Sequence, residues 1–364
     1  MTRWRRALLP LSVPYEMFSR ARAWTYEKGI AQARRLPGVV ISVGNLTVGG
    51  TGKTPFVIWL TRSLLEDGKH VAILTRGYRG NFRGTFSRLD GISKSTGDEN
   101  LSDETRVVAL GLVQEANAAT HLAFGVGPKR FEMGAQLAGD GFDWFVLDDG
   151  FQHLQLARDL NVLVIDASNP FGGGHLLPAG NLREPRSAIG RADVIIITRT
   201  AHAPAVEAVI RRYAQTVPIF YATMNCESFT PSHEDEAFER LSQQEQRKAE
   251  IFERKRVFAF SAIGNPSAFL DNLHEWGVPV IGQYSFPDHH KISAADAAKV
   301  EVQARAAGAN ALVCTEKDLM NLQKLDAFSL PVWICRASLN VHRADEFWRV
   351  SREILRLRKP EIVK

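Results

Sequence analysis

The chain contains little cysteine, and no part of it is apolar for long enough to cross a bilayer. Its three cysteines, Cys226, Cys314 and Cys335, form no Cys-x-x-Cys pair. This odd count argues against a disulfide framework or a zinc site, and it favours a reducing compartment in which all three are core residues. No apolar run approaches the roughly 18 residues that a membrane-spanning helix needs. Because Pro10 and Pro14 interrupt the apolar part of the N-terminus, we do not expect a secretory signal peptide.

Length and composition indicate a globular protein of two domains. The 364 residues are 45% hydrophobic and 23% charged, which supplies enough apolar side chains for real cores and excludes a disordered chain. The segment from about 222 to 256 is polar and charged, and we interpret it as an exposed loop or helix near a domain junction. We therefore expect an N-terminal segment at 1–35, a larger domain at 36–222 and a smaller one at 223–364.

Basic residues are concentrated at the N-terminus. Residues 1–35 carry a net charge of +6, against +5 for the whole chain, and Trp4 and Trp24 lie among these charges. A basic, tryptophan-bearing amphipathic segment suits the surface of an anionic membrane leaflet. The pattern equally fits an ordinary helix packed on its own domain. Nucleic-acid binding is not expected, because the basic residues gather at one terminus rather than along an aromatic-lined face.

A glycine-rich run after an apolar stretch carries the clearest chemical signal. Residues 39–43 predict a buried strand, and a helix begins near Pro55. The loop between them comprises Thr47, Val48, Gly49, Gly50, Thr51, Gly52, Lys53 and Thr54. Glycine lets backbone N–H groups curl around an anion, Lys53 adds a positive charge, and the Thr54 hydroxyl suits Mg²⁺. The usual phosphate loop has glycine where Thr47 stands, so a plain glycine-rich turn is the alternative.

Strand and helix patterns alternate along the chain. The expected strands are rich in Val, Ile and Leu without polar alternation, so both faces of the sheet are covered by helices. They lie at 39–43, 70–74, 122–124, 142–147, 160–165 and 194–198, followed by 257–260, 278–284, 311–315 and 332–335. Helices are expected at 54–66, 103–116 and 128–138. We therefore predict an α/β protein with a P-loop NTPase-like parallel sheet core and a second, smaller α/β domain.

Two further clusters in the larger domain suit phosphate chemistry. Asp148 and Asp149 directly follow the strand at 142–147, where carboxylates suit a Mg²⁺ site beside the phosphate loop; an Asp-Gly turn is the alternative. Arg183 and Glu184 follow a run of three glycines at 172–174. Arg183 suits neutralisation of a transferring phosphate and Glu184 suits a Mg²⁺ shell, although a surface Arg–Glu pair explains the pattern as well.

Two clusters in the smaller domain have less specific patterns. The run Phe-Pro-Asp-His-His at 286–290 includes His289, which a neighbouring aspartate would orient as a general base; surface histidines are the alternative. The run Thr-Glu-Lys-Asp at 315–318 resembles base-reading motifs of nucleotide-binding proteins. A helix N-cap with exposed charges is the better interpretation of its spacing.

Taken together, these motifs resemble the tetraacyldisaccharide 4′-kinase family, the lipid A 4′-kinases. The resemblance runs from the basic N-terminus to about residue 335. It includes segments 44–55, 76–78, 148–153, 177–185, 286–290 and 315–318, in the family's order and approximate spacing. The runs Asp-Asp-Gly-Phe-Gln-His and Leu-Pro-Ala-Gly-x-Leu-Arg-Glu are specific, because generic P-loop proteins lack them. The family's phosphate loop departs from the usual pattern at the same place as Thr47.

The resemblance implies a lipid kinase that uses ATP and Mg²⁺. The enzyme would transfer the γ-phosphate of ATP to the 4′-hydroxyl of a tetraacylated glucosamine disaccharide 1-phosphate, giving the bis-phosphorylated lipid A precursor. It would lie on the cytoplasmic face of a Gram-negative inner membrane without crossing it, and we expect a monomer. The family assignment raises the expectation that residues 1–35 contact that membrane.

The resemblance also implies roles for the residues of this chain that match the family's motifs. Residues 47–54 would bind ATP, with Lys53 and the loop amides on the β- and γ-phosphates. Thr54, Asp148 and Glu184 would serve Mg²⁺. Asp149 would organise the nucleophile and, with His153 and Tyr78, contact the substrate, while Arg183 would lie nearby.

The resemblance also implies a base aspartate that is oriented by His289, and the sequence leaves two candidates. The family motif reads Gly-Asp-Glu-Pro. Asp98 has the preceding Gly and following Glu, but Asn100 replaces Pro. Asp103 lacks the Gly and the Pro but leads directly into an expected helix, as the family motif does. We favour Asp103.

Two other functions remain open at this point. A P-loop GTPase of the metal-chaperone type would need Asn-Lys-x-Asp and Cys/His clusters, where this chain has Thr-Glu-Lys-Asp at 315–318 and no such cluster. A nucleotide-dependent membrane adaptor without catalysis would have no need of Asp103 or His289.

Overall fold

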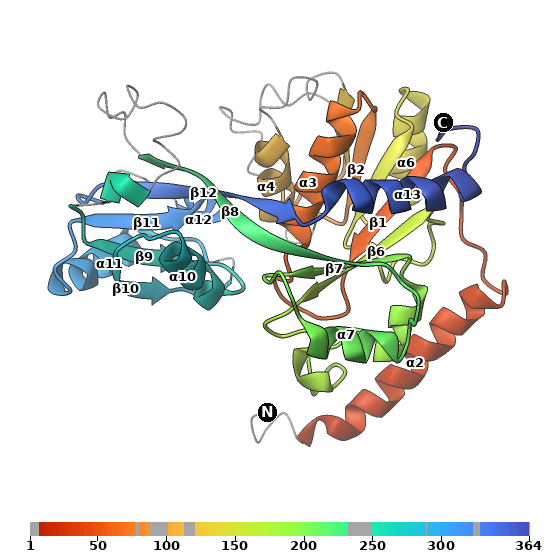
Figure 1. The fold of residues 1–364 in the computed structure, drawn as a ribbon, viewed down its shortest axis with the longest axis horizontal. Coiled ribbons are helices and arrows are strands. Elements are labelled where there is room, and N and C mark those ends of the chain that lie inside the picture. The colour runs from red at the N-terminus through yellow and green to blue at the C-terminus, as the bar shows by residue number, and fades with distance from the viewer. Residues whose placement is uncertain are drawn as a thin grey trace. The chain divides into compact units, whose positions relative to one another are not determined.

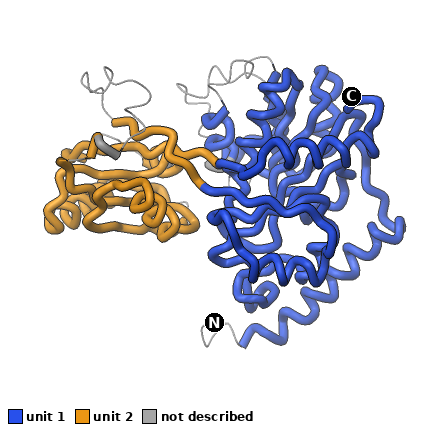
Figure 2. Tube along the Cα trace, viewed as in Figure 1, with its two compact units in different colours: residues 1–223, 340–364 blue, residues 224–339 orange. Residues whose placement is uncertain are grey.

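The computed structural model describes residues 7–77, 80–86, 101–112, 121–231, 249–252, 254–288, 290–322 and 328–363 (Figure 1). The chain folds into two compact units, coloured separately in Figure 2. Unit 1 comprises Met1–Thr223 and Asn340–Lys364, and unit 2 comprises Met224–Leu339. No helix within the described ranges is long and apolar enough to span a membrane.

Unit 1 is built on a mostly parallel sheet, as predicted. In spatial order its strands are β8 (Ile219–Pro231), β7 (Val194–Thr198), β6 (Leu160–Asp166), β1 (Val39–Gly44), β5 (Trp144–Asp148), β2 (Val71–Thr75), β4 (Leu122–Val126) and β3 (Gly84–Phe86). The edge strand β3 pairs antiparallel with β4, and β1 lies parallel between β5 and β6. Every residue of β1, β2, β4, β5, β6 and β7 is buried, which is why these strands read as unbroken apolar runs.

Unit 1 also contains six described α-helices, several of which cover this sheet. They are α2 (Leu9–Glu27), α3 (Lys53–Glu66), α4 (Asp103–Leu112), α6 (Arg130–Gly139), α7 (Pro204–Arg211) and α13 (Ala344–Arg358). Helix α3 shows how the sequence specifies them: Phe56, Leu60 and Leu64 recur every four residues and are at most 2% exposed. This spacing places one apolar stripe against the sheet. Because α3 follows β1 and the glycine-rich loop, its N-terminus lies at the carboxyl end of the sheet.

The structure corrects the predicted extent of the second domain. Residues 340–364 were expected in the smaller domain but belong to unit 1. Phe347 of α13 is fully buried and packs edge-on against Phe56 and Trp59 of α3, with ring centroids 5.9 and 5.3 Å away. The prediction of a polar loop or helix at 222–256 is also wrong at its start. Strand β8 continues through it to Pro231, with mostly half-buried residues that hide the strand pattern.

Unit 2 is a second parallel α/β unit, as predicted. Its sheet runs in the order β10 (Val280–Ser285), β9 (Val257–Ser261), β11 (Ala311–Thr315) and β12 (Val332–Val341), all parallel where they pair. Its helices are the 3₁₀ turn η4 (Ala249–Phe252), α10 (Pro266–Glu275), α11 (Ala294–Ala306) and α12 (Glu316–Asn321). Two apolar clusters form its core, one around Phe260 and Leu312 and the other around Phe252 and Trp333. The three cysteines are free, and Cys314 and Cys335 are buried as expected.

Candidate functional site

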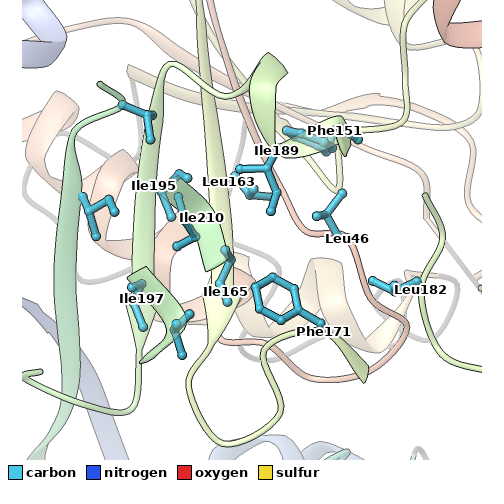
Figure 3. Close-up of a cluster of buried hydrophobic side chains, with 14 of the residues drawn as sticks. Leu46, Phe151, Leu163, Ile165, Phe171, Leu182, Ile189, Ile195, Ile197 and Ile210 are labelled. Carbon is cyan, nitrogen blue, oxygen red and sulfur yellow. The ribbon is translucent and has the colours of Figure 1, made fainter. Parts of the chain in front are cut away.

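A shared core anchors the loops that carry the predicted site residues. Leu46 precedes the phosphate loop, Phe151 belongs to the Asp-Asp-Gly-Phe-Gln-His run, and Leu182 precedes Arg183. All three are at most 2% exposed and lie in one cluster with residues from β6 and β7 (Figure 3). Each loop therefore has an apolar residue buried beneath it and polar residues on either side. This arrangement holds three segments of distant sequence at one end of the sheet.

The glycine-rich loop has the conformation of an anion cradle. Gly49 and Gly52 adopt φ of +120° and +80°, values that favour glycine. The amide of Asn45 braces the loop from inside, because its Nδ2 donates to the Thr51 hydroxyl at 2.9 Å and to the Thr47 carbonyl at 2.8 Å. Helix α3 begins at Lys53, so its free N–H groups and positive dipole end lie at the loop. The predicted residues 47–54 are thus placed as one structural element.

Neighbouring segments fix the outside of this loop. The Thr198 hydroxyl at the end of β7 donates to the Thr51 carbonyl at 3.0 Å. Thr47 pairs antiparallel with Leu182, and the Val48 N–H donates to the Asn181 carbonyl at 2.8 Å. The segment that carries Arg183 and Glu184 therefore lies directly beside the phosphate loop, as its predicted function requires.

Asp149 lies at the centre of a cluster of cations. Arg183 Nη1 donates to both of its carboxylate oxygens, at 2.9 and 2.7 Å, and Lys53 Nζ lies 3.6 Å from Oδ1. Burial raises the pKa of Asp149, but Lys53 and Arg183 outweigh that effect and lower the pKa overall. Asp149 also has φ of +49°, which is rare for a residue with a side chain and typical of strained functional sites.

A buried arginine that the sequence analysis missed supports the same turn. Arg130, the first residue of α6, is 3% exposed, and its Nη1 donates to the Asp149 carbonyl at 3.3 Å. Burial lowers the pKa of Arg130, whereas the charges of Asp148 and Asp149 oppose that shift. Asp148 is itself 6% exposed and accepts a hydrogen bond from the Thr75 hydroxyl at 3.5 Å. Two carboxylates and three cations thus share the carboxyl end of β5.

Glu184 is held by side chains on one of its two oxygens. Its Oε2 accepts from Arg191 Nη2 at 2.6 Å and from Gln152 Nε2 at 3.2 Å, and Gln152 Nε2 also lies 2.9 Å from the Asn45 carbonyl. Within the described ranges, no hydrogen bond to Oε1 competes with a ligand. The carboxylate is therefore fixed beside the phosphate loop with one oxygen available.

His153 is a neutral imidazole in this environment. Burial, with Arg130 and Arg158 adding to it, lowers the pKa of His153 to about 4. Arg158 does not titrate either at physiological pH, although burial lowers its pKa to about 10. Its guanidinium donates to the carbonyls of Gly150, Phe151 and His153, at 3.3, 3.2 and 2.8 Å, and so fixes the turn that carries them. His153 can therefore hydrogen-bond to a sugar hydroxyl as donor or acceptor near pH 7.

Comparison with known proteins identifies the family of this chain. The profile of the family described as tetraacyldisaccharide-1-P 4′-kinase matches residues 4–355. This chain belongs to that family. A tetraacyldisaccharide 4′-kinase of Geobacter metallireducens is 39% identical over 320 residues, covering 86% of this chain and 88% of the relative. The family is one of ATP-dependent kinases that phosphorylate a lipid A precursor.

A solved structure of the same family shares the fold. The structure of LpxK from Aquifex aeolicus in complex with ATP is 31% identical and covers 97% of this chain and 99% of its own, with a TM-score of 0.69. A second relative, the tetraacyldisaccharide 4′-kinase of Pelobacter propionicus, is 37% identical over 325 residues, covering 87% of this chain and 84% of the relative. The mixed α/β fold with a large parallel sheet, predicted from the sequence, is thereby confirmed.

Four of the predicted residues are only partly placed or lie outside the described ranges. Tyr78, Asp98 and His289 lie outside them. Asp103 is the first residue of α4, preceded by Ser102, whose hydroxyl accepts from the Thr105 N–H at 3.3 Å as an N-cap does. Asp103 thus leads into a helix, as expected from the family pattern.

The turn on either side of His289 is nevertheless well anchored within unit 2. Asp288 is paired with Lys317 Nζ at 2.8 Å, and His290 Nε2 lies 3.0 Å from Asp296 Oδ2. The His290 ring also stacks on Phe286 with centroids 4.9 Å apart. Lys317 belongs to the 315–318 run, where Thr315 forms a capping box at the start of α12. The helix N-cap predicted for that run is confirmed, but its charges are not exposed as expected, because Asp318 is fully buried.

The sequence analysis also missed an ion pair behind the phosphate loop. Arg199 follows β7 and has φ of +68°; its Nε donates to Asp166 Oδ2 at 2.8 Å and its Nη2 to the Gly50 carbonyl at 3.4 Å. Asp166 ends β6, the parallel neighbour of β7. Both residues therefore belong to the carboxyl edge of the sheet, and their positions directly at adjacent strand ends were the available signal.

Proposed function

We propose that unit 1 carries out the family reaction through the cluster around Asp149. In this reaction the γ-phosphate of ATP passes to the 4′-hydroxyl of tetraacyldisaccharide 1-phosphate. The observation that supports the proposal best is the convergence of Lys53, Arg183 and Arg130 on Asp149, directly beside the phosphate loop. Positive groups held in place before the reaction stabilise the charge on a transferring phosphoryl group.

Each part of the cluster has a distinct task in this proposal. The amides of residues 47–54 and the N-terminus of α3 bind the phosphates, and Lys53 moves from Asp149 to their β- and γ-oxygens. Arg183 neutralises charge that develops during transfer. Asp149 and the neutral His153 contact the sugar of the acceptor, together with Tyr78. These roles use hydrogen-bond donors and acceptors whose protonation states are fixed by burial for His153 and by neighbouring cations for Asp149.

The residues present fit a magnesium ion that is held mainly through the nucleotide. Among the described residues, no three His, Cys, Asp or Glu side chains gather into a protein-built metal site. Mg²⁺ in kinases commonly needs only one or two protein oxygens besides phosphates and water. Thr54 in the first turn of α3, Asp148 at the end of β5 and the open oxygen of Glu184 supply such oxygens. When bound, the ion would offset the charge of the phosphates.

The base in this proposal is Asp103, with His289 as its orienting partner. A base must come within about 3 Å of the acceptor hydroxyl in the reacting complex. Helix α4, which Asp103 begins, packs on α3, because the backbone of Gly111 lies against Ile58 and its carbonyl accepts from Arg62 Nη2 at 3.2 Å. The aspartate is therefore on an element attached to the helix that follows the phosphate loop.

Attachment to a lipid surface is the second part of the proposal. Helix α2 exposes Val13, Met17, Phe18 and Trp24 by 59%, 67%, 69% and 50%. Exposed apolar side chains flanked by basic residues are typical of helices that lie in a membrane interface. We place this face on the cytoplasmic leaflet of the inner membrane, where the acylated substrate is available to a monomer.

Phosphate transfer from radiolabelled ATP to tetraacyldisaccharide 1-phosphate in detergent micelles tests the function. Wild type should give a bis-phosphorylated lipid, and Lys53→Ala should reduce the rate by a factor on the order of 10². Lys69→Ala, beyond the other end of α3, is the matched control and should be unchanged. If folded, ATP-binding wild type transfers no phosphate, the kinase proposal is wrong and GTP hydrolysis should be screened.

The same assay identifies the base. Asp103→Ala should lower kcat by a factor on the order of 10², whereas Asp98→Ala should leave it nearly unchanged. The reverse pattern would assign the base to Asp98. A loss of kcat in His289→Ala, with ATP and vesicle binding intact, would count against the non-catalytic adaptor.

A further inference from the structure

Helix α2 presents two different faces to its surroundings. Leu9, Val13, Met17 and Trp24 recur at helical spacing and are 37–67% exposed. Ser12, Tyr15 and Arg22 recur with the spacings three and seven, so they occupy the opposite side of the helix. Ser12 is 8% exposed, and the Tyr15 ring packs on the core cluster beneath the site loops. The side of the helix with Ser12, Tyr15 and Arg22 is therefore attached to unit 1, and Leu11 and Phe18 next to it are 57% and 69% exposed.

Three polar residues on the inner face, Ser12, Tyr15 and Arg22, bond to loops that carry site residues. The Ser12 hydroxyl donates to the Leu176 carbonyl at 3.0 Å and accepts from the Ala179 N–H at 3.3 Å. Arg22 Nη1 donates to the Gln152 carbonyl at 3.1 Å. These contacts join α2 to the Leu-Pro-Ala-Gly-x-Leu-Arg-Glu segment and to the Asp-Asp-Gly-Phe-Gln-His segment.

The contact between Tyr15 and Arg183 is the most consequential. The Tyr15 hydroxyl donates to the Arg183 carbonyl at 2.9 Å, while the Arg183 N–H donates to the Leu46 carbonyl at 2.7 Å. The Arg183 backbone is thus held from both sides, and its guanidinium forms the two-pronged contact with Asp149. Burial, with Glu184 adding to it, raises the pKa of Tyr15, so its hydroxyl keeps the proton that it donates. Restraint at the backbone limits where the guanidinium can go.

We propose that Tyr15 is a positioning residue for phosphoryl transfer, which holds Arg183 at Asp149 and makes α2 a structural part of the active site. The inference rests on the proposed kinase function. It implies that the helix whose outer face meets the lipid surface also sets the geometry of the reacting centre. A small displacement of a charge-stabilising group is costly, because the stabilisation of a transition state depends steeply on geometry.

Tyr15→Phe removes the hydrogen bond and keeps the ring that packs on the core. We expect kcat with tetraacyldisaccharide 1-phosphate to fall about five- to tenfold, with KM for ATP within about twofold of wild type. Tyr26→Phe is the matched control on the same helix, because the Tyr26 hydroxyl has no hydrogen-bond partner among the described residues. It should retain wild-type kcat. Both variants should co-sediment with vesicles of phosphatidylethanolamine and phosphatidylglycerol as wild type does.

A double-mutant cycle separates positioning from a merely structural role. If Tyr15 acts through Arg183, then Tyr15→Phe should have little further effect on kcat in an Arg183→Lys background. Full additivity of the two changes, or a Tyr15→Phe enzyme with the kcat of Tyr26→Phe, would overturn the inference while wild-type transfer leaves the kinase function intact. Loss of vesicle binding in Tyr15→Phe would also overturn it, because the change would then act on attachment. Failure of wild-type transfer would instead refute the proposed function.

Discussion

Replacing Arg130 with methionine measures how much the buried cation contributes at the end of β5. The substitution keeps much of the side-chain volume but leaves the carboxylates of Asp148 and Asp149 with one cation fewer. Removing one partner of a fully buried ion pair costs about 3–5 kcal/mol when nothing else compensates. Here Lys53 and Arg183 remain on Asp149, and Thr75 remains on Asp148. We therefore expect a loss of about 2–3 kcal/mol in the free energy of unfolding.

Thermal unfolding at neutral pH is the direct assay. A loss of this size lowers Tm by about 5–10 °C for a folding unit of this size. Arg20→Met provides the contrast, because Arg20 pairs with Glu16 on the surface, where their side chains are 58% and 37% exposed. Such exposed pairs contribute at most about 1 kcal/mol. An Arg130→Met protein whose Tm falls no further than that of Arg20→Met would refute the reasoning.

The sign of the pH dependence follows from Asp149. Its pKa is lowered in the folded protein, so it contributes stability at pH values above its unfolded pKa of about 3.9. That contribution is lost as the pH falls through the folded pKa, where both states bind the proton. The Tm difference between wild type and Arg130→Met should therefore persist from pH 8 to 5 and shrink only in stronger acid. A difference that disappears already near pH 6 would contradict the assignment to a carboxylate.

Two further substitutions test other parts of the site. The pKa of His153 is lowered to about 4, so unfolding takes up a proton between that value and about 6.5, and wild-type stability should fall as the pH falls through this range. His153→Gln cannot titrate, so urea unfolding should show a flatter pH dependence; an identical slope in both proteins would contradict a buried neutral His153. Arg199→Gly relieves a positive φ but removes the contacts with Asp166 and Gly50, so KM for ATP should rise about three- to tenfold with kcat retained. An unchanged KM would show that this pair does not shape the phosphate loop.

Most strands of the sheet could be predicted, because burial on both faces constrains the residue type at each position of a strand. Strands buried on both faces must be apolar at every position, so β1, β5, β6 and β7 read directly as runs of Val, Ile and Leu. β8 was not predicted at all: its second half passes through half-buried positions and carries Asn225 and Glu227, although most of its first half is buried and apolar. The C-terminal helix buries a stripe at Phe347, Ser351 and Leu355, of which the first and last are apolar. Its partner, α3, lies almost 300 positions earlier in the chain, and no local pattern identifies that partner.

In the candidate site, too, some residues are marked by a local sequence pattern and others are not. Glycines that need positive φ, and charged residues directly after buried strands, mark the phosphate loop and Asp148–Asp149 in the sequence. Arg130 gave no such signal, because an arginine in the first turn of a helix normally faces solvent. It is buried here because folding places the N-terminal residue of α6 beside the turn that follows β5, next to two carboxylates. The role of Arg130 depends on Asp148 and Asp149, which the sequence around Arg130 does not identify as its neighbours.

Helix α2 makes the strongest case for this distinction. Its apolar and basic residues fitted either a membrane-surface segment or a helix packed on its own domain, and α2 both exposes Val13, Met17 and Trp24 and bonds to unit 1. Ser12 and Tyr15 look unremarkable in the sequence, yet their hydroxyls reach backbone carbonyls 164 and 168 positions away. A hydroxyl that bonds to a backbone carbonyl needs no particular side chain at the receiving position, so the pairing leaves no trace in residue type. The connection from the outer face of α2 to Arg183 therefore becomes visible only in three dimensions.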